Sequence, residues 1–525
     1  MENTTSRRGF IKATAGGAAV LAGLGALRVQ NASADEPAYT VPFGDQFSRK
    51  ANARQLTDDL WWVGASDKRI ALFENVYPLT QGVAYNSYLL LDDDTVLFDT
   101  VDRSVVGQYF ENIDAVLDGR DLNYLVVHHM EPDHSYAIAQ VLHNYPNCKV
   151  VTSAMAAGMI QQFFGYDVSE RLVTVTEGDQ LVTGKHTLAF VNAPMVHWPE
   201  VIMSFDATTG TLFSADAFGS FNALDGNMYA DQVNFQENWL DEARRYFCNI
   251  VGKYGPQVQD VLAKAGTLDI AMVCATHGPV WRQDLGWFID KYDKWSSYTP
   301  EDNGVVIFCG SIYGNTENAA NILASQLSEA GVSNVKVYDI SKTHVSWLIA
   351  ECFRASNLVF AAPTYNMGIF TPMKNFLNDM VAHNLQNRCV SFIENGTWSP
   401  VSGQLMQDIV AQMPNMVKIG ETITVRSGVT DENVAQLKDL AAAIALSIET
   451  GGTEGTVLEP SATNADPAAG TMEGAEKTDP TDEPTGTKQW KCTVCGYIYE
   501  GDELPADFVC PVCGKDASFF EEVSE

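Results

Sequence analysis

A dense group of metal-binding side chains follows a short apolar segment in the first half of the chain. Residues 123–127 predict a buried strand, and His129, Glu131, Asp133 and His134 lie directly after it. Imidazole nitrogens and carboxylate oxygens are side-chain ligands that proteins offer to iron and zinc. The spacing therefore indicates a metal site in the loop at the end of this strand.

Three later segments end in the same way. Apolar runs that predict strands are followed by His197, Asp216 and His277. Because strand ends of a layered sheet lie together at one edge, we expect the four groups to converge on a single two-metal site. The alternative for any one group is a loop side chain with satisfied hydrogen bonds, but that alternative has to hold for all four segments at once.

The residue at position 131 bears on which metal is bound. A zinc hydrolase with the same spacing has a histidine where this chain has Glu131. With Glu131, the expected ligands include three carboxylates beside four imidazoles. Hard, anionic ligands stabilise a higher-charge iron ion better than they suit zinc. The composition of the site therefore favours a redox-active di-iron pair over a hydrolytic di-zinc pair.

The spacing H-x-[HE]-x-D-H, followed at wide intervals by His, Asp and His, resembles that of the metallo-β-lactamase fold. With glutamate in the second position it resembles the flavodiiron proteins, and the resemblance covers nearly all of the chain beyond its N-terminal segment. It implies that one iron is held by His129, Glu131, His197 and Asp216. It implies that the other iron is held by Asp133, His134, His277 and the same Asp216, which would bridge the two ions.

Three residues near this motif stand outside the ligand set. His128 is expected to have a structural or supporting role. Tyr136 departs from the small residue that the family pattern has after "DHS", and we expect it to narrow the pocket or alter its packing. Tyr246 either resembles a tyrosine beside the metals that supplies a proton or is a core aromatic residue.

The loop 310–320 has the composition of a phosphate-binding turn between a strand and a helix. Ser311 and Thr316 offer hydroxyls, Gly314 lets the backbone approach closely, and amide N–H groups at a helix start point towards an anion. The loop lacks the lysine of a P-loop, so triphosphate chemistry is disfavoured. Taken alone, the loop is also compatible with an ordinary turn.

Two further loops, 363–370 and 394–399, are expected at the same sheet edge. They supply Tyr365 and Trp398 for contact with a ring system. The three loops resemble the FMN site of flavodoxins, although the third departs from the Gly/Ser-Tyr-Gly-Trp form of many members. The resemblance implies FMN contacts from Ser311, Tyr313, Gly314, Asn315, Thr316, Pro363, Thr364, Tyr365, Asn366, Gly396 and Trp398, with Glu394 as a further residue of the third loop.

Four cysteines near the C-terminus form two C-x-x-C-G knuckles: Cys492, Cys495, Cys510 and Cys513. Their thiolates are expected to bind one metal ion tetrahedrally. The knuckles and the surrounding aromatic residues resemble rubredoxin, although the segment between the pairs is shorter than in free rubredoxins. The resemblance implies one iron, and zinc is the alternative because zinc ribbons share the spacing.

The chain is therefore expected to be an α/β multidomain protein. Residues 45–299 predict a metallo-β-lactamase-like αββα di-iron domain, and residues 302–449 predict a flavodoxin-like, doubly wound parallel sheet that binds FMN. Residues 450–487 are rich in Gly, Pro, Thr and acidic side chains and predict a disordered acidic linker. Residues 488–525 predict a small rubredoxin-like domain.

The N-terminal segment 1–34 has the features of a twin-arginine signal peptide. Its "SRRGFIK" motif precedes a weakly apolar run that is too short to span a membrane, and the small-residue site "ASA" follows. A basic disordered tail is the alternative. The signal predicts export to the periplasm or cell envelope with cofactors already loaded, and no stable membrane insertion.

Composition limits the partners. The chain has 66 Asp and Glu against 33 Lys and Arg, and a formal net charge of −33 disfavours nucleic acid and anionic lipid as partners. The cysteines outside the knuckles are expected to be core thiols, with disulfides as the alternative: Cys148, Cys248, Cys274, Cys309, Cys352 and Cys389.

The resemblance implies an electron relay from the rubredoxin iron through FMN to the di-iron pair, where O2 is reduced to water, NO to N2O, or both. It also implies a head-to-tail homodimer or a homotetramer. The electron-donor reductase is unknown, and export would require a donor outside the cytoplasm. Two other functions stay open. One is a metal-dependent hydrolase with accessory redox domains, and the other is an electron shuttle without turnover of its own.

Overall fold

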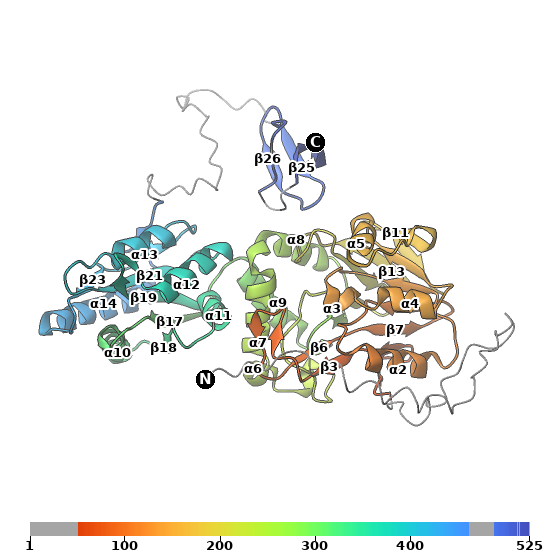
Figure 1. Ribbon diagram of the computed structural model, residues 1–525, viewed down its shortest axis with the longest axis horizontal. Helices are drawn as coiled ribbons and strands as arrows, with labels where there is room; N and C mark the ends of the chain where they lie inside the picture. The colour runs from red at the N-terminus through yellow and green to blue at the C-terminus, as the bar shows by residue number, and fades with distance from the viewer. Residues whose placement is uncertain (1–50, 461–487, 512, 514, 524–525) are drawn as a thin grey trace, which may run out of the picture. The chain divides into compact units, whose positions relative to one another are not determined.

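The computed structural model describes residues 51–460 and 488–523 apart from 512 and 514. The predicted signal peptide and residues 461–487 of the predicted linker lie outside the described residues. The described chain has three parts, which are a two-sheet α/β part, a parallel-sheet part and a small C-terminal part (Figure 1).

The first part contains two sheets. The seven-stranded sheet has the order β1-β2-β7-β8-β9-β10-β11. Its strands are β1 (Arg54–Gln55), β2 (Leu60–Trp62), β7 (Tyr88–Leu91), β8 (Thr95–Phe98), β9 (Tyr124–Val126), β10 (Lys149–Thr152) and β11 (Leu172–Thr174). The five-stranded sheet has the order β12 (Gln180–Val182), β13 (Thr187–Asn192), β14 (Ile202–Asp206), β15 (Thr211–Phe213) and β16 (Met272–Cys274). Both confirm the predicted metallo-β-lactamase-like layers.

Short apolar segments of the sequence form the core of this part. Every residue of β8, β14, β15 and β16 is buried, as expected of strands covered on both faces. Strands β8, β9 and β10 pair in parallel, so their carboxyl ends lie at one edge. Two small ribbons complete the part, β3 (Ala65–Asp67) with β6 (Val83–Tyr85) and β4 (Leu72–Phe73) with β5 (Tyr77–Pro78).

Helices accompany the two sheets, with α2 packed on β7 and α5 on β11. The helices are α2 (Val106–Leu117), α3 (Pro132–Ser135), α4 (Ile138–Asn144), α5 (Ala154–Phe164), α6 (Phe235–Asn238), α7 (Leu240–Tyr246), α8 (Gly255–Ala265) and α9 (Leu285–Ser296). A π-helical turn, Phe247–Val251, continues α7. Ser153 caps α5 by accepting a hydrogen bond from the Ala156 N–H.

The second part is a doubly wound sheet, as predicted. Strands β18 (Val335–Asp339), β17 (Asp302–Cys309), β19 (Ala355–Tyr365) and β21 (Cys389–Asn395) lie side by side in parallel. β21 also pairs in parallel with β22 (Val417–Lys418) and with β23 (Ile423–Val425). β20 (Gly368–Ile369) pairs antiparallel with the end of β19. The helices are α10 (Asn315–Glu329), α11 (Val345–Arg354), α12 (Thr371–Ala382), α13 (Ser402–Val410) and α14 (Asp431–Thr450).

This part extends beyond the predicted boundary at residue 449. Strand β24 (Thr456–Val457) pairs antiparallel with β22, and the Leu458 N–H donates to the Met416 carbonyl. The predicted start of the linker at residue 450 is therefore wrong, because a two-residue strand after Gly451 and Gly452 returns the chain to the sheet edge.

The third part is a three-stranded antiparallel sheet. β25 (Gln489–Cys492) lies between β26 (Ile498–Glu500) and β27 (Phe520–Glu522). Aromatic rings fill its small core, with Phe508 packed against Tyr499 at 4.7 Å and against Phe520 at 5.2 Å between ring centroids. A chain segment this short buries little apolar surface, so a bound metal is expected to contribute to its stability.

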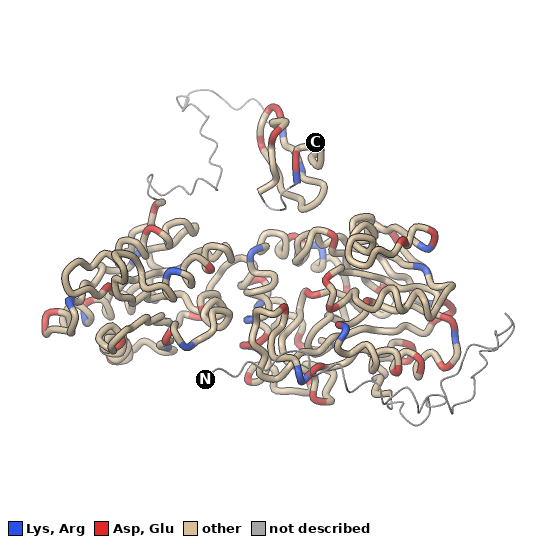
Figure 2. The backbone as a smooth tube through the Cα atoms, viewed as in Figure 1, with Lys and Arg blue, Asp and Glu red and all other residues tan. Residues whose placement is uncertain are grey.

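Acidic side chains occur along all three parts, with fewer Lys and Arg between them (Figure 2). The six cysteines outside the knuckles are free and buried, which confirms their prediction as core thiols. Among the described residues, no helix combines the length and the apolar character that crossing a membrane would require.

Candidate active site

The structure brings the seven predicted metal ligands together. His129 and Glu131 follow β9, Asp133 and His134 lie on α3, and the others follow β13, β15 and β16. His197 Nε2 lies 3.1 Å from both Glu131 Oε2 and Asp216 Oδ2, and His277 Nε2 lies 3.3 Å from Asp133 Oδ2. The predicted convergence of four strand ends is confirmed.

The ligands form two adjacent groups, which we call the first and second half-sites. The first half-site consists of His129, Glu131, His197 and Asp216, and the second of Asp133, His134 and His277. Within each, one ligand atom per residue lies within 4.8 Å of the others. Asp216 faces both, because its Oδ2 lies near His197 and its Oδ1 lies 3.0 Å from His134 Nε2. This is the geometry that a bridging Asp216 requires.

The donor atoms fit a pair of cations. Both Asp133 oxygens, His129 Nε2 and His277 Nε2 are buried and make no hydrogen bond among the described residues. They approach one another without hydrogen-bond geometry, so they face common points rather than each other. Leaving such groups unsatisfied costs about 1–3 kcal/mol each. Cations held between them would remove this penalty.

Neighbouring imidazoles keep the Glu131 and Asp216 carboxylates ionised by lowering the pKa of each. Burial would raise the pKa of Glu131, but the adjacent imidazoles of His129 and His197 hold that pKa below its usual range. Burial would lower the pKa of His134, but Asp133 and Asp216 raise the pKa to about 9. The His134 and His197 imidazoles, both with a pKa of about 9, thus carry protons that a cation must displace, so metal binding is coupled to proton release.

Several supporting residues were not predicted. Thr276 Oγ1 donates to Asp216 Oδ1 at 2.5 Å, and His277 Nδ1 donates to the Ala84 carbonyl at 2.7 Å. Glu200 Oε1 accepts from His129 Nδ1 at 2.8 Å. Such partners orient metal-binding imidazoles and fix the tautomer. The available signal was the motif "HWPE", which puts an acid three residues after His197.

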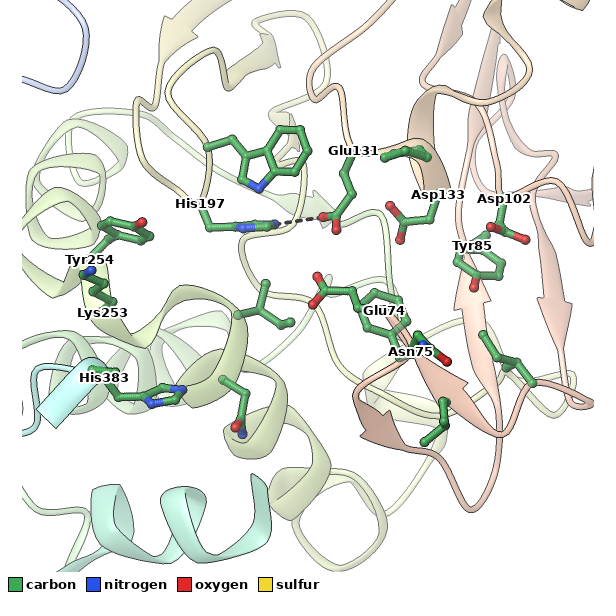
Figure 3. A pocket seen from close by; sticks show the side chains of 18 residues that line it. Glu74, Asn75, Tyr85, Asp102, Glu131, Asp133, His197, Lys253, Tyr254 and His383 are labelled. Carbon is green, nitrogen blue, oxygen red and sulfur yellow. Dashed lines mark hydrogen bonds and ion pairs between the residues drawn. The ribbon is translucent and has the colours of Figure 1, made fainter. Parts of the chain in front are cut away.

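A cavity of 760 Å³ opens onto the metal ligands. Figure 3 shows Glu131 and Asp133 on its wall, with the Glu74 carboxylate directed towards Glu131. Burial and the neighbouring Glu131 raise the pKa of Glu74 to about 8. Glu74 was not predicted, because a glutamate in the short turn between β4 and β5 carries no signal of function in the sequence.

The three residues outside the ligand set have different outcomes. His128 has a structural role, because its ring is hydrogen-bonded in the core. Its Nδ1 lies 2.6 Å from Asp99 Oδ2, and its Nε2 lies 2.8 Å from Ser204 Oγ. Tyr136 does not line the cavity and is 42% exposed, with Arg103 6.0 Å from its ring. The expectation that Tyr136 narrows the pocket is therefore wrong, because it lies two residues past His134 on a helical turn and faces elsewhere.

Tyr246 lies beside the second half-site. Its ring centroid is 5.4 Å from that of His277, and its hydroxyl is buried with no hydrogen-bond partner among the described residues. Burial, with Asp216 and Asp133 nearby, raises the pKa of Tyr246 well above its ordinary value. Gly219 makes room for the ring, because a Cβ there would lie 2.9 Å from Tyr246 Cε1. The hydroxyl thus holds its proton close to the ligands.

The predicted flavin loops meet around a second cavity, of 690 Å³, at the carboxyl ends of β17, β19 and β21. The predicted residues that line it are Ser311, Tyr313, Asn315, Thr316, Pro363, Thr364, Tyr365, Asn366, Gly396 and Trp398.

Two of the residues that were predicted for the flavin site do not line the cavity. Gly314 starts α10 with a φ of 90°, a left-handed conformation that favours glycine, and its N–H donates to Ser311 Oγ at 3.0 Å. Glu394 accepts from the Gly403 N–H and from Thr424 Oγ1, so it supports the loop from inside. The cavity also takes in residues that were not predicted, among them Met367 and Ser427.

The four knuckle cysteines converge in the third part. Their sulfur atoms lie within 4.8 Å of one another, with Cys492 and Cys513 3.6 Å apart and Cys495 and Cys510 3.4 Å apart. The group fits one ion bound by four thiolates, as predicted. We call it the four-thiolate site.

Comparisons with known proteins agree with these three sites. Residues 83–278 match the ODP family beta lactamase, residues 307–413 match flavodoxin, and residues 490–521 match the rubredoxin-like domain of rubrerythrin. An anaerobic nitric oxide reductase flavorubredoxin from Vibrio vulnificus is 26% identical over 497 residues, which is 88% of this chain and 98% of the relative. An uncharacterized protein from Methanocaldococcus jannaschii is 27% identical over 384 residues, covering 72% and 95%.

Solved structures share the fold. Rubredoxin oxygen:oxidoreductase from Desulfovibrio gigas matches with a TM-score of 0.71 and 28% identity, covering 76% of this chain and 99% of that one. The flavodiiron protein from Giardia intestinalis matches with a TM-score of 0.71 and 22% identity, covering 77% and 99%. The chain therefore has the architecture of the flavodiiron proteins joined to a rubredoxin-like domain.

Proposed function

We propose that this chain is a flavodiiron oxidoreductase that reduces O2 to water, NO to N2O, or both. One observation carries the proposal, which is the convergence of seven ligands, three of them carboxylates, on two half-sites that share Asp216. The relatives named for nitric oxide reductase and rubredoxin oxygen:oxidoreductase activities support the same reaction class.

When bound, the iron pair supplies ferrous ions that bind and reduce a small diatomic gas. The chain's own residues hold Glu131 and Asp216 ionised and keep protons nearby. Tyr246 retains its hydroxyl proton beside His277, and Glu74 lies on the cavity wall with its carboxyl directed towards Glu131 (Figure 3). These two groups can supply the protons that formation of water requires.

We propose that electrons reach the metal pair from iron in the four-thiolate site through FMN. The exposed rim of the flavin cavity supports docking of another protein surface there, since Tyr313 is 92% exposed and Trp398 is 85% exposed. The family resemblance makes a second copy of this chain the docked surface, in a head-to-tail homodimer or a homotetramer, so that FMN of one copy serves the metal pair of the other.

We further propose that the chain is exported through its N-terminal twin-arginine motif and receives electrons from a donor outside the cytoplasm. The motif "SRRGFIK" and the small-residue site after it support this proposal. Fractionation of cells should find a shortened chain outside the cytoplasm. A full-length chain confined to the cytoplasm would contradict export.

The reaction is tested by reducing the full chain anaerobically with a small chemical reductant and adding either gas. The proposal predicts that O2 or NO reoxidises the flavin over repeated turnovers, and the ratio of the two rates identifies the preferred gas. A hydrolase is the second candidate, because the metallo-β-lactamase-like part has that chemistry in its fold class. Hydrolysis of a lactam or thioester at a rate independent of the flavin's redox state would favour it.

A further inference from the structure

The two half-sites differ in what lies behind one imidazole of each. In the first half-site, His129 Nδ1 donates to the Glu200 carboxylate at 2.8 Å. In the second, His277 Nδ1 donates to the neutral Ala84 carbonyl at 2.7 Å. In both residues Nε2 is the nitrogen that faces the other ligands. The two imidazoles are therefore fixed in the same tautomer but are supported by groups of different charge.

Glu200 is placed to hold a negative charge inside the protein. Its residue is 2% exposed, and it lies in the loop between β13 and β14 that also carries His197. Oε1 accepts a second hydrogen bond from the Met130 N–H at 2.8 Å, and Oε2 has no hydrogen-bond partner among the described residues. No Lys or Arg of the described chain forms an ion pair with Glu200. Its charge therefore acts mainly through His129.

We propose that Glu200 is a positioning residue that makes the two half-sites unequal: the first half-site binds its cation more tightly, and iron there is oxidised more easily than it would be without Glu200. A carboxylate behind a metal-binding imidazole raises the ligand's basicity, and in a buried site its charge is weakly screened. Both effects favour a more highly charged ion. The redox half of this inference rests on the proposed function, whereas the affinity half does not.

Position 99 offers a matched control. Asp99 is also buried and its Oδ2 accepts from a histidine Nδ1, that of His128, at 2.6 Å. His128 is one residue before His129 but is not in the ligand set. The substitutions Glu200→Gln and Asp99→Asn therefore both change a carboxylate to an amide. The first does so next to the metal ligand His129, and the second next to His128, which is not a ligand. Glu200→Asp keeps the charge and serves as the conservative variant.

The first test is a titration of the full chain with Co²⁺ after the His and carboxylate ligands have been stripped of metal, while the four-thiolate site keeps its own ion. We expect a tight and a weaker binding step. Glu200→Gln should weaken one step about 10-fold, in the range usual for such supporting residues, and leave the other unchanged. Asp99→Asn should change neither, and Glu200→Asp should restore most of the affinity.

Unchanged Co²⁺ constants in Glu200→Gln would overturn the proposal, as would equal weakening of both steps. Flavin content and absorption of the four-thiolate site show whether each variant is folded. This titration involves no gas turnover, so failure of O2 or NO reduction would leave its result standing.

The second test follows ⁵⁷Fe-loaded chain by Mössbauer spectroscopy at graded potentials. Glu200→Gln should raise the midpoint potential of one iron, with a tenfold change in the equilibrium corresponding to about 59 mV for a one-electron step. The other iron and the Asp99→Asn chain should keep the wild-type values. A Glu200→Gln chain in which neither midpoint moves would overturn the redox half of the proposal.

Discussion

The metal site and the flavin site are built in different ways. Six of the seven metal ligands are buried, Glu131 is half-buried, and supporting contacts come from Thr276 and Glu200. The flavin cavity is formed by three loops, and its aromatic rim is exposed, with Trp398 at 85%. The metal site is thus fixed by side chains inside the core, whereas the flavin site depends on backbone loops and is completed by its ligand.

Loss of the shared ligand tests the rigid side of this comparison and should have the largest effect. Asp216→Ala removes the one carboxylate that faces both half-sites, so we expect loss of both ions and a fall in gas reduction of more than about 100-fold. Metal analysis and gas consumption measure this. The exposed Asp225→Asn serves as control. Two retained ions in Asp216→Ala would show that the half-sites do not depend on this bridge.

Loss of one knuckle thiolate tests whether the third part feeds the flavin. Cys495→Ser should abolish iron binding at the four-thiolate site and slow flavin reduction by an external protein donor by roughly 100-fold, because the tethered carrier no longer raises the local electron-donor concentration. Stopped-flow absorption follows the flavin. Reduction by a small chemical reagent should be unchanged, and an unaltered rate with the protein donor would exclude the relay.

A change at the exposed rim tests the adaptable side of the comparison. Trp398→Ala should weaken FMN binding by about 1 kcal/mol, roughly fivefold, since one aromatic contact is lost while the loops remain. Fluorescence titration of the flavin-free chain measures the affinity. Phe163→Ala changes an exposed aromatic residue in the first part and should have no effect. If metal content also fell in Trp398→Ala, the two sites would not be independent.

The smallest effect concerns a histidine remote from both sites. Burial would lower the pKa of His186, but hydrogen bonds from its two nitrogens to Asp206 and Asp59 raise it. Lys185 also contacts Asp59, and the His186 N–H donates to Asp92.

Because the folded-state pKa of His186 is raised, its stabilising contribution is complete below the unfolded value of about 6.5 and is lost as pH rises through the folded value. Melting temperatures should therefore differ more between the wild-type chain and His186→Gln at pH 6 than at pH 9. A difference that grows with pH would contradict this assignment.

The sequence predicted the parts of the molecule in which local pattern determines position. The convergence of metal ligands that follow apolar runs was correctly expected, but not their origin at one sheet edge. His129 and Glu131 follow β9 of the seven-stranded sheet, whereas the later ligands follow β13, β15 and β16 of the five-stranded sheet. The βα alternation likewise predicted the doubly wound sheet. Glu200, Thr276 and Glu74 could not be predicted, because their partners are far away in sequence and their own surroundings carry no periodic signal.

The predictions were wrong where the local backbone conformation or strand pairing determines a residue's position and the composition does not. Tyr136 was expected at the pocket, but the helical turn of α3 directs Asp133 and His134 inwards and leaves Tyr136 outside. Strand β24 lies in a segment whose composition predicts a linker, and only pairing with β22 gives it structure. Pairing of this kind depends on a partner that local composition does not identify.

The central claim is that the two half-sites hold a redox-active iron pair that receives electrons from FMN. Metal and flavin analysis of the purified full chain, joined to anaerobic reduction and exposure to O2 or NO, tests it most directly. We predict two irons in the half-sites, one metal ion in the four-thiolate site, one FMN, and flavin that either gas reoxidises repeatedly. Two zinc ions in the half-sites, with reduced flavin that neither gas reoxidises, would contradict it.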